Sequence, residues 1–274
     1  MDFVTVSREL GTEGGEIAEN VAKILGYRFV DTKAIEKAAA EMGFLESVAE
    51  VDEKAPSFFK RFLSHKPTVE LDRLNSIIYE LARKGNTVFL GRGGQILLNS
   101  FDCALHVRVI ASRPKRIRNL MEKGYAKEAA AKAIEKSDHE KSSFIRFAFR
   151  REWDDPGLYD LVINMDKLSV NLAVESILAV ARSDDIKACT ADSLQAIGRM
   201  ALADRVEAAI IEAGLSWGQT YSVSVSVPEP GKVLLTGLVE EEGAKKRAEG
   251  VVKLVKGVEA VDNRIRVTKT DRHV

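Results

Sequence analysis

The chain of 274 residues has only two cysteines, Cys103 and Cys189, and no long apolar run. Two distant cysteines cannot build a disulfide framework or a structural zinc site, so we expect two buried or free thiols in a reducing compartment. No run approaches the roughly 20 apolar residues that span a bilayer. The N-terminal residues MDFVTVSREL lack the basic region and apolar stretch of a signal peptide. These absences predict a cytoplasmic protein.

An excess of charge of either sign is also absent. The chain carries 41 Lys and Arg residues and 41 Asp and Glu residues, so its formal net charge is zero. Bulk electrostatics therefore give no reason to expect nucleic acid or an anionic membrane as a partner. A hydrophobic content of 45% is enough to fill one large core or two smaller ones.

Short apolar runs separated by long helical patterns organise the first two thirds of the chain. Their order predicts an α/β fold, with a parallel sheet flanked by helices. The five runs are Phe3–Val6, Tyr27–Val30, Thr87–Leu90, Ala104–Ile110 and Leu161–Ile163.

The last third has a different pattern. A polar stretch without a strong period predicts a linker over 183–197, which follows a first domain over 1–182. Residues 198–270 then show a helical stripe, two alternating strands that form a hairpin, a second helical stripe and a third strand. We therefore expect a small α+β domain with the order αββαβ.

A glycine-rich turn lies between the first predicted strand and the first predicted helix. Gly11, Gly14 and Gly15 follow Phe3–Val6, and a helical apolar pattern begins at Ile17. Backbone N–H groups and the positive end of the helix dipole converge at such a turn, which attracts phosphate. A strand-to-helix turn in which glycines serve only close packing is the structural alternative.

The turn lacks the lysine of the standard nucleotide-binding signature GxxxxGK[ST]. Gly14 occupies the position of that lysine and Glu16 that of the Ser or Thr, while Glu13 adds a second carboxylate. A carboxylate about 4 Å from a phosphate charge costs roughly 4 kcal/mol at an effective dielectric constant of 20. Either Arg8 offsets this cost, or Mg²⁺ bridges Glu16 to the phosphates, or triphosphate binds poorly.

Three blocks of sequence resemble the cytidylate kinase-like family of P-loop nucleoside monophosphate kinases. They are VSRELGTEGGEIAENVAKILGYRFVD from Val6, FLGRGG over 89–94, and the segment over 136–164 that contains REWDDPGLYDLVIN. The resemblance covers roughly residues 1–182 and implies a P-loop kinase-type sheet. The C-terminal unit resembles a BON domain, through GKVLLTGLV over 231–239 and VKGVEAVDNRIRV over 255–267.

The resemblance implies roles for particular residues. Arg8 and the turn would hold the donor phosphates, Asp31, Thr32 and Arg92 would bind the acceptor nucleotide, and Glu16 would contact Mg²⁺. The catalytic arginines would be Arg92, Arg116 and Arg146, because guanidinium groups can hold two phosphate oxygens at once. The implied turn residues are Gly11, Thr12, Gly14, Gly15 and Glu16.

Structural alternatives exist for several of these residues. Asp31 could simply cap the following helix. Arg116 could lie on a solvated helix face, and Arg146 could pack beside Phe147 and Phe149.

Two functions follow from the resemblance and from the departures from the family pattern. The first is an ATP-dependent, Mg²⁺-assisted kinase that phosphorylates CMP or dCMP. The second is a catalytically inactive nucleotide-binding regulator that docks or signals through its BON-like domain, which could bind a protein partner or a second copy. The missing lysine and Gly93, where relatives carry an aspartate, favour the second.

Overall fold

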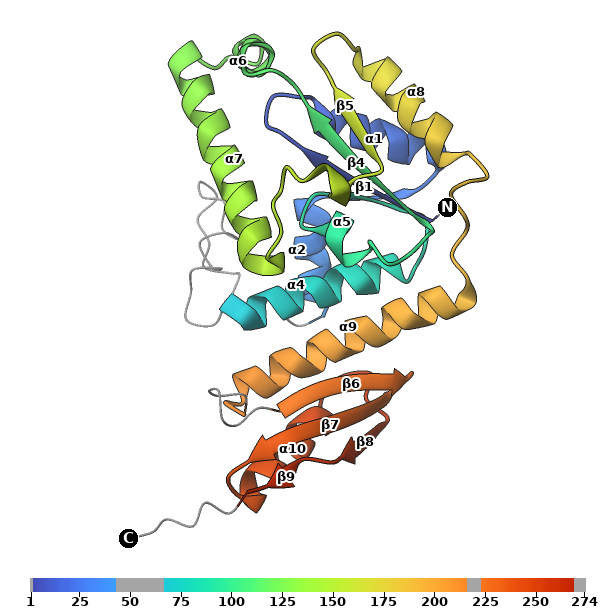
Figure 1. The fold of residues 1–274 in the computed structure, drawn as a ribbon, viewed down its shortest axis with the longest axis vertical. Helices are drawn as coiled ribbons and strands as arrows, with labels where there is room; N and C mark the ends of the chain where they lie inside the picture. The colour runs from blue at the N-terminus through green and yellow to red at the C-terminus, as the bar shows by residue number, and fades with distance from the viewer. Residues whose placement is uncertain (1, 43–66, 216–222, 269–274) are drawn as a thin grey trace. The chain divides into compact units, whose positions relative to one another are not determined.

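The computed structural model describes residues 2–42, 67–215 and 223–268, and the first of its two sheets has five parallel strands (Figure 1). The strand order is β2-β3-β1-β4-β5. All five predicted strands are confirmed, and so is the predicted parallel pairing. Their bounds are β1 (Phe3–Arg8), β2 (Arg28–Val30), β3 (Thr87–Leu90), β4 (Ala104–Ile110) and β5 (Leu161–Asn164).

The register of the central strands brings their carboxyl ends to one edge of the sheet. Phe3 of β1 lies opposite Thr87 of β3 and Ala104 of β4, and Val6 lies opposite Leu90. The loops after β1 and β3 therefore leave the sheet side by side. Ligands bind at this edge in open α/β folds.

Helices flank this sheet, as predicted. Helices α1 and α8 pack together on it, and their apolar faces join the strands in a core that contains Ile17, Val21 and Ile177. The helices are α1 (Gly14–Leu25), α2 (Thr32–Glu41), α5 (Gly94–Leu97), α6 (Arg113–Glu122), α7 (Lys127–Phe149) and α8 (Val170–Ala181), with a 3₁₀ turn η1 (Pro156–Leu158).

The second sheet lies in the C-terminal third and confirms the small α+β domain. Strands β6 and β7 form an antiparallel hairpin, and β8 and β9 pair with β7 in parallel. The predicted third strand is thus two short strands, separated by Arg264 and the buried Ile265. The elements are α9 (Ala191–Glu212), β6 (Val223–Glu229), β7 (Lys232–Val239), α10 (Glu242–Lys253), β8 (Ala260–Asn263) and β9 (Arg266–Val267).

The contacts divide the chain into two units, and the division is not sequential. One unit holds residues 1–40 and 84–191, and the other holds 41–83 and 192–274. Helix α4 (Pro67–Ala82) therefore groups with α9, which begins inside the segment predicted as a linker. The domain boundaries 1–182, 183–197 and 198–270 stay a prediction.

The expectation of two unpaired thiols is wrong. Cys103 and Cys189 form a disulfide, with their Cα atoms 5.0 Å apart. Cys103 directly precedes β4, and the chain after α8 returns to the amino ends of the strands, where the Cys189 amide donates to Asp2 Oδ2 at 2.5 Å. The large separation of the two cysteines in the sequence did not indicate that they lie close together in the fold. The reducing compartment inferred from unpaired thiols loses that support.

No helix in the described part of the chain is long and apolar enough to cross a membrane.

Candidate phosphate-binding site

The glycine turn after β1 leads directly into α1. The helix begins at Gly14, and its N-cap residue Glu13 has a left-handed backbone with φ 63° and makes no side-chain capping bond. The first hydrogen bond of the helix runs from the Ile17 amide to the Glu13 carbonyl at 3.0 Å. The amides of Gly14, Gly15 and Glu16 therefore have no acceptor within the helix, as at any helix start.

Close packing explains two of the three glycines. A Cβ on Gly11, whose φ is 87°, would lie 2.8 Å from the carbonyl oxygen of Arg116, and one on Gly14 would lie 2.5 Å from Arg8 Cβ. The structural alternative is therefore correct for these two positions, whatever the turn binds. A Cβ on Gly15 would meet only Leu90 at 3.9 Å, an ordinary contact. Packing does not require glycine there.

Thr12 holds the turn in shape. Its side chain is fully buried, and its hydroxyl donates to the Glu9 carbonyl at 2.8 Å. The Asn119 amide group donates to the Gly11 carbonyl at 2.8 Å from α6. Thr12 therefore supports the backbone of the turn.

Three cationic side chains gather beside the turn: Arg8, Arg92 and Lys141, here called the cation group. A Cβ on Gly91 would lie 2.6 Å from Arg8 Nη1, so the Arg8 guanidinium reaches from β1 to the turn after β3. Burial, and then the charge of Arg92, lowers the pKa of Arg8 to about 10. Burial, and then the charge of Arg8, lowers the pKa of Lys141 to about 8.

Arg92 occupies the strained turn after β3. Its φ is 59°, and glycines with positive φ flank it on both sides. Its Nη2 donates to Thr32 Oγ1 at 3.1 Å, so two of the predicted acceptor-binding residues lie together. Burial lowers the pKa of Arg92, against the opposing charge of Glu36. A non-glycine residue in this conformation is costly and is typical of functional sites.

Asp31 is a helix cap in this structure. Its Oδ1 accepts from the Ala34 amide at 2.9 Å, at the start of α2. The structural alternative thus accounts for one of its carboxylate oxygens.

Arg116 is buried, and its donors are engaged within the protein. It forms two bonds with Asp138 at 2.7 and 2.9 Å, donates to the Leu10 carbonyl at 2.7 Å and lies 3.4 Å from Glu9. It therefore ties α6 to α7 and to the turn. The solvated helix face that was its structural alternative does not describe it.

Arg146 and Glu16 lie apart from any such cluster. The Arg146 side chain is 65% exposed and pairs with Glu152 through two bonds of 2.7 and 3.1 Å. Glu16 is exposed on the first turn of α1. In the described ranges, it belongs to no group of three or more side chains that could hold a metal ion.

Lys141 is a residue of the cation group that the sequence analysis did not predict as part of the site. Its Nζ donates to Ser137 Oγ at 2.7 Å and lies 5.6 Å from the centre of the Trp153 ring. Trp153 in turn donates to Ser7 Oγ at 2.8 Å, which ties the segment after α7 to β1. The spacing of four residues between Ser137 and Lys141 was visible in the sequence. The closeness of Lys141 to Arg8, in contrast, depends on how α7 packs.

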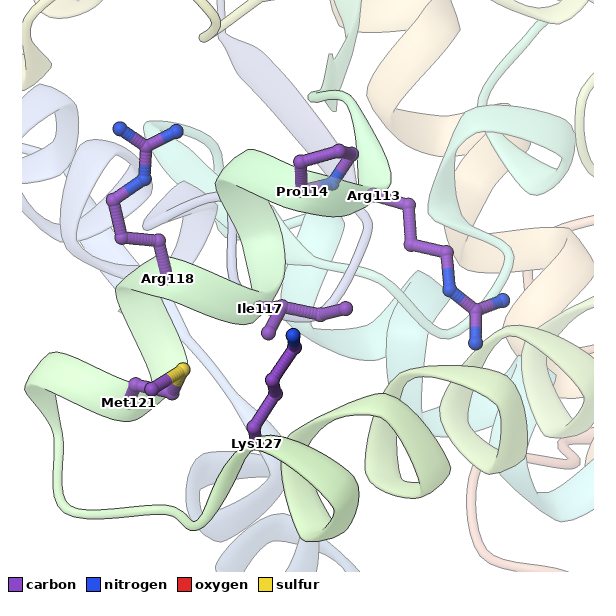
Figure 2. A pocket seen from close by; sticks show the side chains of 6 residues that line it. All are labelled: Arg113, Pro114, Ile117, Arg118, Met121 and Lys127. Carbon is purple, nitrogen blue, oxygen red and sulfur yellow. The ribbon is translucent and has the colours of Figure 1, made fainter.

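A separate pocket of about 400 Å³ lies between α6 and the start of α7 (Figure 2). In Figure 2 the Lys127 amine points toward Ile117, while Arg113 and Arg118 point away from each other. None of the predicted site residues lines this pocket, so the cation group at the turn remains the candidate site. The residues that line the separate pocket are Arg113, Pro114, Ile117, Arg118, Met121 and Lys127.

A parallel sheet whose first strand leads through a glycine turn into the first helix, with cations at that turn, defines the architecture of the P-loop kinases. The model of the cytidylate kinase-like family matches residues 3–167, and the chain belongs to this family. The BON domain model matches residues 201–269. Both resemblances seen in the sequence are confirmed.

Solved structures support the fold. An uncharacterized protein from Eubacterium ventriosum is 19% identical, with a TM-score of 0.54 over 66% of this chain and 97% of that one. Shikimate kinase from Bacteroides thetaiotaomicron is 12% identical, with a TM-score of 0.43 over 66% of this chain and 99% of that one. Deoxyadenosine kinase from M. mycoides is 14% identical, with a TM-score of 0.39 over 66% and 100%. The last two scores are too low to carry an argument. A search of curated proteins finds no match.

Proposed function

We propose that residues 1–182 form an ATP-dependent nucleoside monophosphate kinase that acts on CMP or dCMP with Mg²⁺. One observation carries this proposal: Arg8, Arg92 and Lys141 gather beside the open amides of α1, so closely that Arg92 lowers the pKa of Arg8 and Arg8 lowers the pKa of Lys141. Like charges at close range are costly unless an anion lies between them. A transferring phosphoryl group supplies that negative charge.

The residues divide between the two substrates in this proposal. The amides of Gly14, Gly15 and Glu16 cradle the donor phosphates, and Arg92, together with Thr32, holds the acceptor phosphate. Arg8 and Lys141 neutralise the group in transit. A bond forms between an acceptor phosphate oxygen and the γ-phosphorus of ATP, the bond to the β–γ bridging oxygen breaks, and the products are ADP and CDP or dCDP.

Mg²⁺ fits the single exposed carboxylate of Glu16, because this ion is held in such sites by one or two carboxylates together with the phosphates. When bound, it neutralises phosphate charge. Arg8 and Lys141 are the side chains that supply positive charge in place of the missing lysine. Arg116 acts as a positioning residue in this scheme, through its bonds to Asp138 and the Leu10 carbonyl.

The second candidate function is a nucleotide-binding regulator without catalysis. The pairing of Arg116 with Asp138 and of Arg146 with Glu152 favours it, because both arginines would have to exchange partners to reach a phosphate. In either case we propose that the BON-like domain, 198–270, docks a protein partner or a second copy. A measured molar mass in solution, with and without residues 198–270, tests self-association.

The location of the protein is also a proposal. A nucleotide kinase needs cytosolic ATP, and we propose a cytoplasmic protein on that ground. The Cys103–Cys189 disulfide argues against it, because such bonds are uncommon in reducing compartments. Thiol labelling of protein taken directly from cells decides the point: unlabelled cysteines contradict a reduced cytoplasmic protein.

Turnover assays with ATP, Mg²⁺ and a panel of monophosphates separate the two functions. ADP formation that CMP or dCMP stimulates, and that Arg92→Ala abolishes, supports the kinase. Arg182→Ala is the matched control, because Arg182 is an exposed residue at the end of α8. Nucleotide binding without turnover supports the regulator, and absence of binding to any nucleotide contradicts both.

A further inference from the structure

Three carboxylates meet between two helices of the second unit, away from the glycine turn. Asp72 belongs to α4, and Asp204 and Glu207 belong to α9. One oxygen from each lies within 4.8 Å of the others. Asp204 and Glu207 are three residues apart and thus share a helix face. We call these three residues the acid group.

The burial of Asp72 is an independent sign that the acid group has a ligand. Only 8% of the surface of Asp72 is exposed. Its Oδ2 has no hydrogen-bond partner among the described residues. Asp204 Oδ2 is in the same condition. Buried carboxylate oxygens are almost always hydrogen-bonded, paired with a cation or bound to a metal. For Asp72 and Asp204, the neighbouring charges that act on the carboxyl include other carboxylates of the acid group.

The neighbouring arginines are paired with other carboxylates. Arg73 lies 2.6 Å from Glu212 and 3.2 Å from Glu70, and Arg205 lies 3.5 Å from Glu80. The Arg205 charge does act on Asp204, but it ranks below burial and the two other acids. The charge of Arg205 therefore offsets only part of the effect of burial and of the other two acids on Asp204.

We propose that Asp72, Asp204 and Glu207 bind one divalent cation of the oxygen-preferring kind, the class of Mg²⁺, Mn²⁺ and Ca²⁺. Such ions sit about 2.1–2.5 Å from their ligands, so two oxygens on opposite sides of one ion lie up to about 5 Å apart. The carboxylate oxygens of the acid group, which all lie within 4.8 Å of one another, fit that span. A set of carboxylates without nitrogen or sulfur disfavours zinc and copper.

Helix α4, which carries Asp72, also carries a fourth candidate oxygen ligand. Asn75 follows Asp72 by three residues on α4, and its Oδ1 is buried without a hydrogen-bond partner in the described part of the chain. Helix bundles can hold metal ions with carboxylates that project from facing helices. The ion would also join α4 to α9, which are distant in sequence.

Protons compete with the cation for this group. Burial, and then Glu207, raises the pKa of Asp72 to about 7. Burial, and then Asp72 and Glu207, raises the pKa of Asp204 to about 8. Tyr79 also faces Asp204, and burial together with that charge raises its pKa. Binding should therefore be measured at about pH 8, where protons compete less than they do at neutral pH.

The test is titration of the full chain with Mn²⁺ at about pH 8 without nucleotide, followed by electron paramagnetic resonance of the free ion. We expect one bound Mn²⁺ whose affinity falls at least roughly tenfold in Asp72→Asn and in Asp204→Asn. Asp192→Asn, at an exposed position of the same helix, is the matched control and should bind as the wild type does. Both amide variants retain the side-chain volume and remove repulsion, so they are expected to fold.

Glu16→Gln keeps this result separate from the nucleotide site. Mn²⁺ lost in Glu16→Gln but retained in Asp204→Asn would belong to the glycine turn and would overturn this proposal while leaving the kinase proposal intact. Absence of any bound Mn²⁺ in the wild type, or an affinity in Asp72→Asn and Asp204→Asn equal to that of the wild type, would overturn it as well. Loss of kinase activity alone would leave the Mn²⁺ titration, and hence this proposal, unaffected.

Discussion

The two units of the chain each hold a group of like charges, of opposite sign. The cation group of Arg8, Arg92 and Lys141 lies at the carboxyl ends of parallel strands, beside the start of α1. The acid group lies on the facing sides of two helices. Both groups are partly or fully buried, and both would be more stable with a counter-ion.

The difference lies in how much of the surrounding fold prepares each group for its ligand. At the glycine turn, three amides without helical acceptors and a strained Arg92 lie at the edge of a parallel sheet. At the acid group, the spacing of Asp204 and Glu207 on α9 and the position of Asp72 on α4 set the three carboxylates in place. The first group comes from β1, the turn after β3 and α7, all in the range that the family model matches, whereas the second combines residues of α4 and α9.

The largest expected effect is on turnover, at Arg92. Arg92→Ala should lower kcat/KM by roughly 10²–10³, because it removes a charged donor to the acceptor phosphate. Steady-state kinetics with CMP measure this loss, with Arg182→Ala as the control. A loss shared equally by both variants would mean that Arg92 has no particular role at the site.

Next in size is the contribution of the disulfide to the stability of the first unit. Reduction of Cys103–Cys189, which closes 86 residues of sequence separation, should lower the free energy of unfolding by about 2–4 kcal/mol. Denaturant unfolding with and without reductant checks this value. Tryptophan fluorescence of Trp153 reports on the first unit. Equal stability in both conditions would contradict a structural role for the bond.

The acid group should make the cation-free protein less stable as pH rises. Asp204 has an ordinary pKa of 3.8 and a folded pKa of about 8, so folding favours its protonated form. Its contribution is therefore greatest below about pH 4 and is lost as pH rises through about 8. With chelator at pH 8, Asp204→Asn should unfold roughly 1–3 kcal/mol less readily than the wild type.

Mn²⁺ sharpens that result. Added at pH 8, it should raise the melting temperature of the wild type and leave that of Asp204→Asn unchanged. Calorimetry at pH 4 and pH 8 provides the comparison. A wild type whose stability in chelator does not change between these pH values would contradict the burial of charged acids.

A smaller effect is expected for the affinity of the cation group. Burial and Arg8 hold the pKa of Lys141 at about 8, so ATP affinity should fall as pH rises through about 8 and Lys141 loses its proton. Lys141→Met should weaken ATP binding roughly tenfold at pH 7 and abolish this dependence on pH. Titration calorimetry measures both. Lys123→Met, at an exposed residue that follows α6, should behave as the wild type does.

The smallest expected effect on stability is at Gly15. Gly15→Ala adds a Cβ that meets only Leu90 at 3.9 Å, so the free energy of unfolding should change by less than about 1 kcal/mol. Gly93→Ala is the contrast, because its Cβ would lie 2.2 Å from Phe149 at a φ of 77°. Denaturant unfolding of the pair measures the difference. Comparable destabilisation by both would contradict the packing described at the turn.

Much of the fold was predictable from sequence because its signals are local. Apolar runs and helical stripes gave all five parallel strands and the order of the C-terminal unit. Arg92, between Gly91 and Gly93, was visible for the same reason, since glycines around a charged residue mark a special backbone. The contact between Arg92 and Thr32 was not predicted, because it depends on β2 and β3 being neighbours in the sheet.

The features that sequence reasoning missed depend on contacts between distant segments. The disulfide joins residues that are 86 positions apart in the sequence, with β4 and β5 between them, and no spacing rule predicts it. Lys141 reaches Arg8 only because α7 packs beside the turn. The acid group combines one carboxylate of α4 with two of α9, and neither helix alone differs from an ordinary charged helix.

The central claim is that the cation group and the amides at the start of α1 hold nucleotide phosphates without the usual lysine. A crystal structure with a non-hydrolysable ATP analogue and CMP tests it most directly. The account predicts phosphate density against Gly14–Glu16 within hydrogen-bond reach of Arg8, Arg92 or Lys141. Nucleotide bound only elsewhere, for example in the pocket lined by Arg113 and Lys127, would contradict it.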